Sequence, residues 1–104
     1  MRFYKYTVIF SPDEDTPEAY NVNVPAMPEI CTFGDSLEEA RFMAQDALEL
    51  VILSRLEEGE TIPKDSKPAH LPKKSIVEEV VITVAHQVTA SPANHVQQVL
   101  AQTA

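Results

Sequence analysis

The stretch GDSLEEARFMAQDALELVILSRLEEG, residues 34–59, decides the fold because it predicts one long helix. Ser36 and Glu39 form the S-x-x-E pattern of a capping box, which satisfies backbone N–H groups at a helix start. No Gly or Pro interrupts the interval from Leu37 to Glu58, where good helix formers such as Ala, Leu, Glu, Arg and Met dominate. Gly59 follows where a C-cap glycine belongs. We therefore expect a single continuous helix that ends before this glycine.

The apolar residues of this helix form two sets. A core stripe recurs at steps of three to five residues, as expected for a helix face that packs on a sheet; it consists of Leu37, Ala40, Ala44, Ala47, Leu48, Val51 and Leu56. Further apolar residues widen this stripe: Phe42, Met43, Leu50, Ile52 and Leu53. A chain this short has little room to bury them all, so the sequence predicts apolar surface that another polypeptide covers.

Three strands are predicted before the helix. Arg2–Phe10 alternates polar and apolar residues, which is the pattern of a strand with one buried face. Acidic, small and proline residues at 11–17 are typical of a turn, and Ala19–Val24 then resumes the alternation. Two prolines mark an irregular connection to a short third strand, Ile30–Phe33. The first two strands should therefore form a hairpin.

The chain after the helix begins with a linker. Thr61–Lys74 is polar and holds three prolines and four of the eight basic residues. Ser75–Val88 follows as a nearly continuous β-branched and apolar run, which predicts a strand buried on both faces, in the centre of a sheet or at an interface. Ser91 and Pro92 are typical of the start of a short helix.

These elements predict an α+β fold of βββαβ order. A three-stranded antiparallel meander carries the long helix on one face, and the last strand joins the same sheet. We expect one domain over residues 1–90, followed by a short helix or tail at 91–104.

Composition excludes several classes of protein. The chain has 104 residues, with sixteen acidic and eight basic side chains, and a net charge of −8. A surface this negative repels nucleic-acid backbones, so we expect no direct DNA binding. One cysteine excludes an intramolecular disulfide. No apolar run is long enough for a signal peptide or a membrane span, so we expect a soluble, cytoplasmic protein.

The segment VPAMPEICTFGDSLEEA, residues 24–40, resembles the HicB family of antitoxin-like proteins. That family carries a proline-flanked segment, the motif C-x-x-G-D-[ST]-x-x-E-A and then a long helix, and the resemblance extends over about residues 1–85. One departure is Glu29, because the family usually has glycine after the second proline.

The resemblance implies a partial ribonuclease-H-like βββαβ fold. It also implies a protein that neutralises HicA, a small basic ribonuclease toxin, by occluding its surface. Many members continue into a DNA-binding domain, but the twenty or so uncharged residues that follow the last predicted strand supply neither the elements nor the basic side chains of one. We therefore expect the fold and the protein-binding role without DNA binding.

The sequence gives little support for a catalytic or metal-binding function. Two-metal nucleases need several convergent carboxylates, yet Lys5 and Thr7 occupy the polar face of the first strand. The three histidines show no ligand spacing. Cys31 has no cysteine partner and no basic neighbour, so we expect a buried packing residue. We expect no catalytic residue, no metal and no cofactor.

Two sets of residues are candidates for protein contacts. The acidic hairpin residues Asp13, Glu14, Asp15 and Glu18 would steer a basic toxin, although a merely solvated turn explains them as well. The apolar residues Phe42, Leu50, Leu53, Val96, Val99 and Leu100 would form the contact of a homo-oligomer, a dimer or higher, unless the terminal helix covers the long helix within one chain. The competing function is a homo-oligomeric structural or regulatory protein without a toxin partner.

Overall fold

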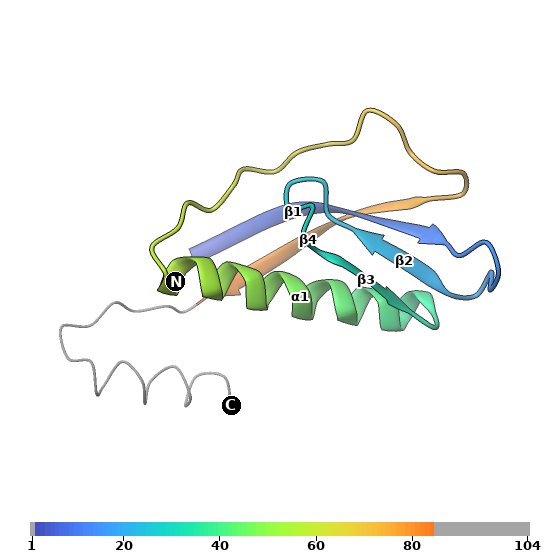
Figure 1. The fold of residues 1–104 in the computed structure, drawn as a ribbon, viewed down its shortest axis with the longest axis horizontal. Coiled ribbons are helices and arrows are strands. Elements are labelled where there is room, and N and C mark those ends of the chain that lie inside the picture. The colour runs from blue at the N-terminus through green and yellow to red at the C-terminus, as the bar shows by residue number, and fades with distance from the viewer. Residues whose placement is uncertain (1, 85–104) are drawn as a thin grey trace.

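The computed structural model describes residues 2–84, which form a four-stranded sheet and one helix (Figure 1). The strands are β1 (Arg2–Pro12), β2 (Tyr20–Asn23), β3 (Cys31–Gly34) and β4 (Ile76–Val84), and the helix α1 (Leu37–Glu57) lies between β3 and β4 in the sequence. The predicted α+β class and element order are confirmed. The short helix or tail predicted at 91–104 lies outside the described residues.

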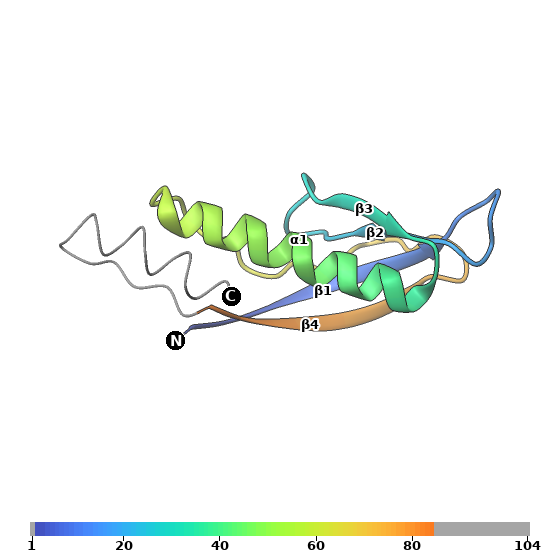
Figure 2. The ribbon, with the colours of Figure 1, turned by 90° about the horizontal axis from the view of Figure 1, so that it is seen from below.

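The sheet has the order β3-β2-β1-β4, and every neighbouring pair is antiparallel. β4 pairs with β1 over its whole length, from Phe10↔Ile76 to Arg2↔Val84. β2 pairs only with the end of β1, from Ile9↔Asn23 to Pro12↔Tyr20. Figures 1 and 2 show this asymmetry: β1 and β4 run side by side, while β2 and β3 are shorter and lie toward one end.

The helix ends are built as the sequence predicts. The Ser36 hydroxyl accepts a hydrogen bond from the Glu39 N–H at 3.1 Å, and the Glu39 carboxylate accepts one from the Asp35 N–H at 2.9 Å. At the other end Gly59 adopts a φ of 72°, where the Cβ of any other residue is strained. The N–H groups of Gly59 and Glu60 donate to the carbonyls of Leu56 and Arg55, which completes a Schellman motif.

The core lies between α1 and the sheet face that it covers. Four helix residues at four-residue spacing are fully buried there: Ala40, Ala44, Leu48 and Ile52. Ile52 therefore belongs to the core and not to the additional apolar set. The helix packs on buried side chains from all parts of the sheet and its connections, chiefly Tyr6, Val8, Phe10, Val22, Val24, Met27 and Ile82. Burial of such side chains contributes about 1.5–3 kcal/mol each.

Gly34 allows the helix to begin directly against β3. A Cβ atom at this position would lie 2.3 Å from the backbone nitrogen of Ala40, which is far inside van der Waals contact. The backbones of β3 and of the first turn of α1 are therefore in direct contact, with no room for a side chain at Gly34.

The linker between α1 and β4 covers the part of β1 that β2 leaves open (Figure 1). The Tyr6 hydroxyl donates to the Pro63 carbonyl at 2.5 Å. The Asp65 carboxylate accepts from both the backbone N–H and the hydroxyl of Thr7, each at 2.8 Å. These contacts bury Thr7 to 2% exposure although it faces away from the helix. Side-chain hydrogen bonds thus hold a long segment that has no secondary structure of its own.

The prediction that the last strand is buried on both faces in the centre of the sheet is wrong for residues 76–84, and the alternative that it lies at an interface stays a prediction. In β4 only Ile82 is fully buried, and Val77 and Val81 on the face away from α1 are 44% and 53% exposed. The reason is that α1 covers only one face of the sheet, and within residues 2–84 nothing covers the other face at β4. The predicted residues beyond Val84 lie outside the described part of the chain.

Candidate partner-binding surface

The acidic hairpin lies at the β1–β2 turn, at the end of the sheet away from the paired residues Arg2 and Val84 (Figure 1). Asp13 has a role inside this turn, because its carboxylate accepts hydrogen bonds from the backbone N–H groups of Asp15 and Thr16, both at 3.1 Å, and from the Asn21 amide at 3.3 Å. The bond from Asn21, followed by those from the backbone, lowers the pKa of Asp13. Glu14, Asp15 and Glu18 are exposed, so three of the four predicted acids face solvent.

The side of α1 that faces away from the sheet carries a mixed surface, which we call the outer stripe: Phe42, Asp46, Glu49, Leu50 and Leu53. Spacings of three and four residues place these side chains along one face. Phe42 and Leu50 are 67% and 61% exposed, and Leu53 is half-buried. Within this stripe two carboxylates lie between Phe42 and the two leucines, and no lysine or arginine belongs to it.

Both cations of α1 are paired away from the outer stripe. Arg41 donates from its Nε to the two carboxylate oxygens of Glu78 on β4, at 3.0 and 3.1 Å. Arg55 donates to Glu29, in the loop before β3, at 2.6 Å. These bonds raise the pKa of each arginine and, at Glu29, lower the pKa of the carboxyl. The carboxylates of the outer stripe therefore have no basic side chain of α1 beside them.

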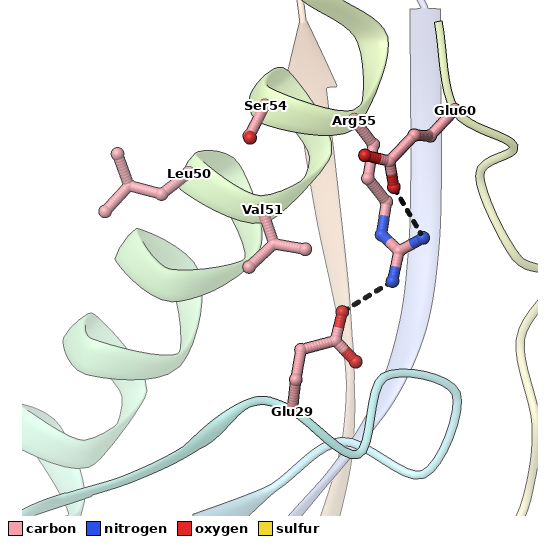
Figure 3. Close-up of a pocket in the computed structure, with 6 residues that line it drawn as sticks. All are labelled: Glu29, Leu50, Val51, Ser54, Arg55 and Glu60. Atoms are coloured by element: carbon pink, nitrogen blue, oxygen red, sulfur yellow. Dashed lines mark hydrogen bonds and ion pairs between the residues drawn. The ribbon is translucent and has the colours of Figure 1, made fainter. Parts of the chain in front are cut away.

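An open pocket of about 280 Å³ adjoins the outer stripe near the end of α1. It is lined by Glu29, Leu50, Val51, Ser54, Arg55 and Glu60. Figure 3 shows the Arg55 guanidinium between the carboxylates of Glu29 and Glu60, the second of which lies 3.6 Å away. Leu50 belongs to both the pocket and the outer stripe, so the two features form one surface.

Carboxylates outnumber cations at this pocket. Glu58 lies next to Glu60, and a hydrogen bond between the two side chains, together with their mutual repulsion, raises the pKa of Glu58. A single arginine thus faces the carboxylates of Glu29 and Glu60, with Glu58 close by. The arrangement favours a positively charged group from outside, because a cation would relieve this crowding.

Sequence reasoning did not find the pocket. Glu29 and Arg55 are 26 residues apart, so no local pattern pairs them. The one signal was Glu29 itself, where the resembling family has glycine. Glu29 has no positive φ, since the only such non-glycine residue among residues 2–84 is Lys74, so the turn does not need glycine.

Other predicted residues have mixed outcomes. The prediction that Cys31 is buried is wrong: it is exposed, because Cys31 and Phe33 lie on the β3 face away from the helix. Val96, Val99 and Leu100 of the predicted oligomer contact lie outside the described residues. Between Arg2 and Val84, no three His, Cys, Asp or Glu side chains gather as they would to hold a metal ion. In the same interval, no helix has the apolar length that a bilayer crossing requires.

Comparison with known proteins identifies the family to which the chain belongs. Residues 5–87 match the family model described as the HicB-like antitoxin of bacterial toxin–antitoxin systems. The UPF0150 protein Ta0767 of Thermoplasma acidophilum is 42% identical over 62 residues, which cover 60% of this chain and 87% of that protein. The match spans the whole described sheet and helix except the start of β1. The chain therefore belongs to the HicB-like antitoxin family.

Proposed function

We propose that this protein is a non-catalytic antitoxin that neutralises a small basic ribonuclease toxin by covering its active or RNA-binding surface. Family membership supports a role in a toxin–antitoxin system. The observation that carries the proposal is the outer stripe, where exposed apolar side chains stand among carboxylates without a cation of α1. Such a surface complements a partner that is basic and partly apolar.

Charge acts first, during the approach of the toxin. The net charge of −8 attracts a basic protein over a distance of about one Debye length, ~8 Å at physiological salt. Glu14, Asp15 and Glu18 extend this field at the hairpin end of the molecule. Steering of this kind increases the association rate more than it increases the final affinity.

Contact at the outer stripe then determines the lifetime of the complex. Phe42 and Leu50 lose exposed apolar area when a partner covers them, which stabilises the complex by about 25 cal/mol per Å². A lysine or arginine of the toxin would enter the pocket beside Leu50, with its aliphatic part on Leu50 and Val51 and its charge near Glu29 and Glu60. The outer stripe is less suited to a second copy of this chain, because its carboxylates would face like charges.

A homo-oligomeric protein without a toxin remains the second candidate. The observation that favours it is β4, whose exposed Val77 and Val81 and outer edge have no partner within residues 2–84. The two functions differ in the partner that each requires: the antitoxin binds a basic protein, and the homo-oligomer binds further copies of the same chain.

Rescue of growth tests the antitoxin function. Where a small basic protein is encoded beside this gene, it is expressed from an inducible promoter, with and without this chain. We expect arrest without the chain and growth with it. The double variant Asp46→Lys/Glu49→Lys should lose the rescue, because it reverses the charge of the outer stripe. The matched control Lys73→Glu/Lys74→Glu, in the linker, should keep it. A neighbour that causes no arrest, or a genome without such a neighbour, would favour the solitary homo-oligomer.

A further inference from the structure

β4 leaves one of its edges open. It is the last strand of the sheet, nine residues long, and on its outer side no strand within residues 2–84 pairs with it. Exposed edge strands are templates for pairing with another chain, and proteins usually protect them with charged side chains, lysine above all, or with proline, a bulge or a short length. β4 contains no proline and no lysine, and it pairs with β1 in an unbroken register.

The backbone groups at this edge can be identified. In an antiparallel pair, successive residues point their N–H and C=O groups alternately toward the partner strand and away from it. The Thr7 N–H donates to Asp65 in the linker, so residue 7 points away from β4. Its register partner Glu79 therefore points toward the open edge, as do Val77, Val81 and Thr83. These four residues offer four donors and four acceptors.

The side chains of β4 favour a dry interface. Seven of its nine residues are β-branched. The two glutamates are each neutralised within the chain, Glu78 by Arg41 and Glu79 by Lys5 at 3.7 Å. Ile76, Val80 and Val84 on the helix side are only half-buried. Charge therefore does not keep a second strand away.

We propose that β4 pairs antiparallel with β4 of a second copy, around a two-fold axis at Val80, so that the two four-stranded sheets become one. In this register Val80 faces its own copy, and Glu79 lies opposite Val81. The outward-pointing residues 77, 79, 81 and 83 meet each other as hydrogen-bonded pairs. No glutamate lies directly opposite another glutamate. On the helix side, Ile76 meets Val84 and adds apolar contact to both.

A second copy fits this edge better than a basic toxin does. The strand is self-complementary about its centre, as a two-fold interface requires. The glutamates of β4 are already paired, so this edge has little attraction for a basic protein, unlike the outer stripe. The proposed dimer does not rest on toxin binding, because the outer stripe lies on a different part of the molecule and remains accessible.

Light scattering coupled to size exclusion tests the dimer with the full chain alone. Wild type at tens of micromolar should have the mass of two chains. Val81→Pro removes an edge N–H that β1 does not use, and Val81→Glu places a carboxylate directly opposite Glu79 of the other copy. Both should weaken the dimer by tenfold or more and keep the far-ultraviolet circular dichroism of the fold. Leu50→Lys on the outer stripe is the matched control and should remain a dimer. A monomeric wild type, or a dimer that persists in both folded Val81 variants, would overturn the proposal.

A cysteine at position 80 tests the register. Non-hydrogen-bonded partners in an antiparallel pair have Cα atoms about 4.5 Å apart, which is within the range of a disulfide. Val80→Cys in a Cys31→Ser background should form a covalent dimer under a mild oxidant. Thr83→Cys in the same background should not, because it meets Val77. Cross-linking at 83 but not at 80 would contradict the two-fold axis at Val80.

Discussion

The two sides of this small sheet differ in how much of their apolar surface is covered. Around β1, β2 and β3, the helix, the turns and the linker cover most apolar side chains, with Phe3 and Phe33 as exceptions, and even Thr7 on the far face is covered by the linker. Beside them β4 contributes one fully buried residue, Ile82; its Val77 and Val81 are exposed, and no strand within residues 2–84 pairs with its outer edge. α1 shows the same division, because Leu48 is buried and Leu50, two residues later, is 61% exposed.

This difference separates the buried residues that stabilise the fold from the exposed residues that can contact another protein. A domain of this length buries only about two-thirds of the surface that its unfolded chain exposes. Here the exposed large apolar side chains lie in pairs on α1 and on β4, and singly on β1, β3 and the linker: Phe42, Leu50, Val77, Val81, Phe3, Phe33 and Leu71. The following substitutions compare a closed position with an open one.

The largest expected difference is between Leu48 and Leu50. Leu48→Ala should lower the free energy of unfolding by about 2–5 kcal/mol, because it leaves a cavity under the helix. Leu50→Ala should change it by less than about 0.5 kcal/mol, since its side chain is mostly in water. Urea denaturation of both variants measures the difference. Equal losses would mean that Leu50 is covered by a part of the chain outside residues 2–84.

The two glycines give the next comparison. Gly34→Ala should cost about 1–3 kcal/mol, because the added Cβ meets the backbone of Ala40 and the strand or helix must shift. Gly59→Ala has open space but a positive φ, and should cost about 1–2 kcal/mol. Thermal melts would show Gly34→Ala as the less stable variant. The reverse order would contradict the close approach of β3 to α1.

Asp65 tests how the linker closes the sheet. Burial raises the pKa of this carboxyl, but the two hydrogen bonds from Thr7 outweigh burial and lower it overall. Because the pKa of Asp65 is lower in the folded state, its stabilisation is present above the pKa of the unfolded chain, about 4. This stabilisation is lost as the pH falls through the pKa of the folded state. Asp65→Asn should cost about 1–2 kcal/mol at pH 7. The difference in the free energy of unfolding between wild type and this variant should shrink toward pH 2. A difference that does not change with pH would contradict the role of the charge.

Glu29 gives the smallest expected effect on stability. Its ion pair with Arg55 is partly exposed, so Glu29→Gln should change the free energy of unfolding by less than about 1 kcal/mol. The lowered pKa of Glu29 has the same sign as that of Asp65, so the loss should disappear in acid. Chemical denaturation at pH 7 and pH 3 measures both values. A loss larger than that of Asp65→Asn would place Glu29 in the core of the fold.

The covered part of the molecule could be predicted because its signals are local. Ser36 and Glu39 predict the start of α1, and Gly59 predicts its end, since capping depends on residues within one turn. The alternation in β1 predicts which side chains point under the helix. The order of the elements and the α+β class follow from these patterns and a few rules of connection.

The open part could not be predicted in the same way. A run of valines has the same sequence at the edge of a sheet as at its centre, so β4 was expected to be buried on both faces. Which face Cys31 occupies depends on a one-residue offset that the short third strand does not reveal. The pairs Glu29–Arg55 and Thr7–Asp65 join residues far apart in the chain, and only the folded arrangement shows them.

Where a small basic protein is encoded beside this gene, titration calorimetry with that purified protein tests the central claim most directly. Wild type should bind with an affinity that falls as salt rises. Asp46→Lys/Glu49→Lys should weaken binding by about tenfold or more, because the outer stripe would then repel the partner. Val81→Pro at the outer edge of β4 should leave the affinity for this protein unchanged. Unchanged binding by the outer-stripe variant, or loss of binding in the β4 variant alone, would contradict the account.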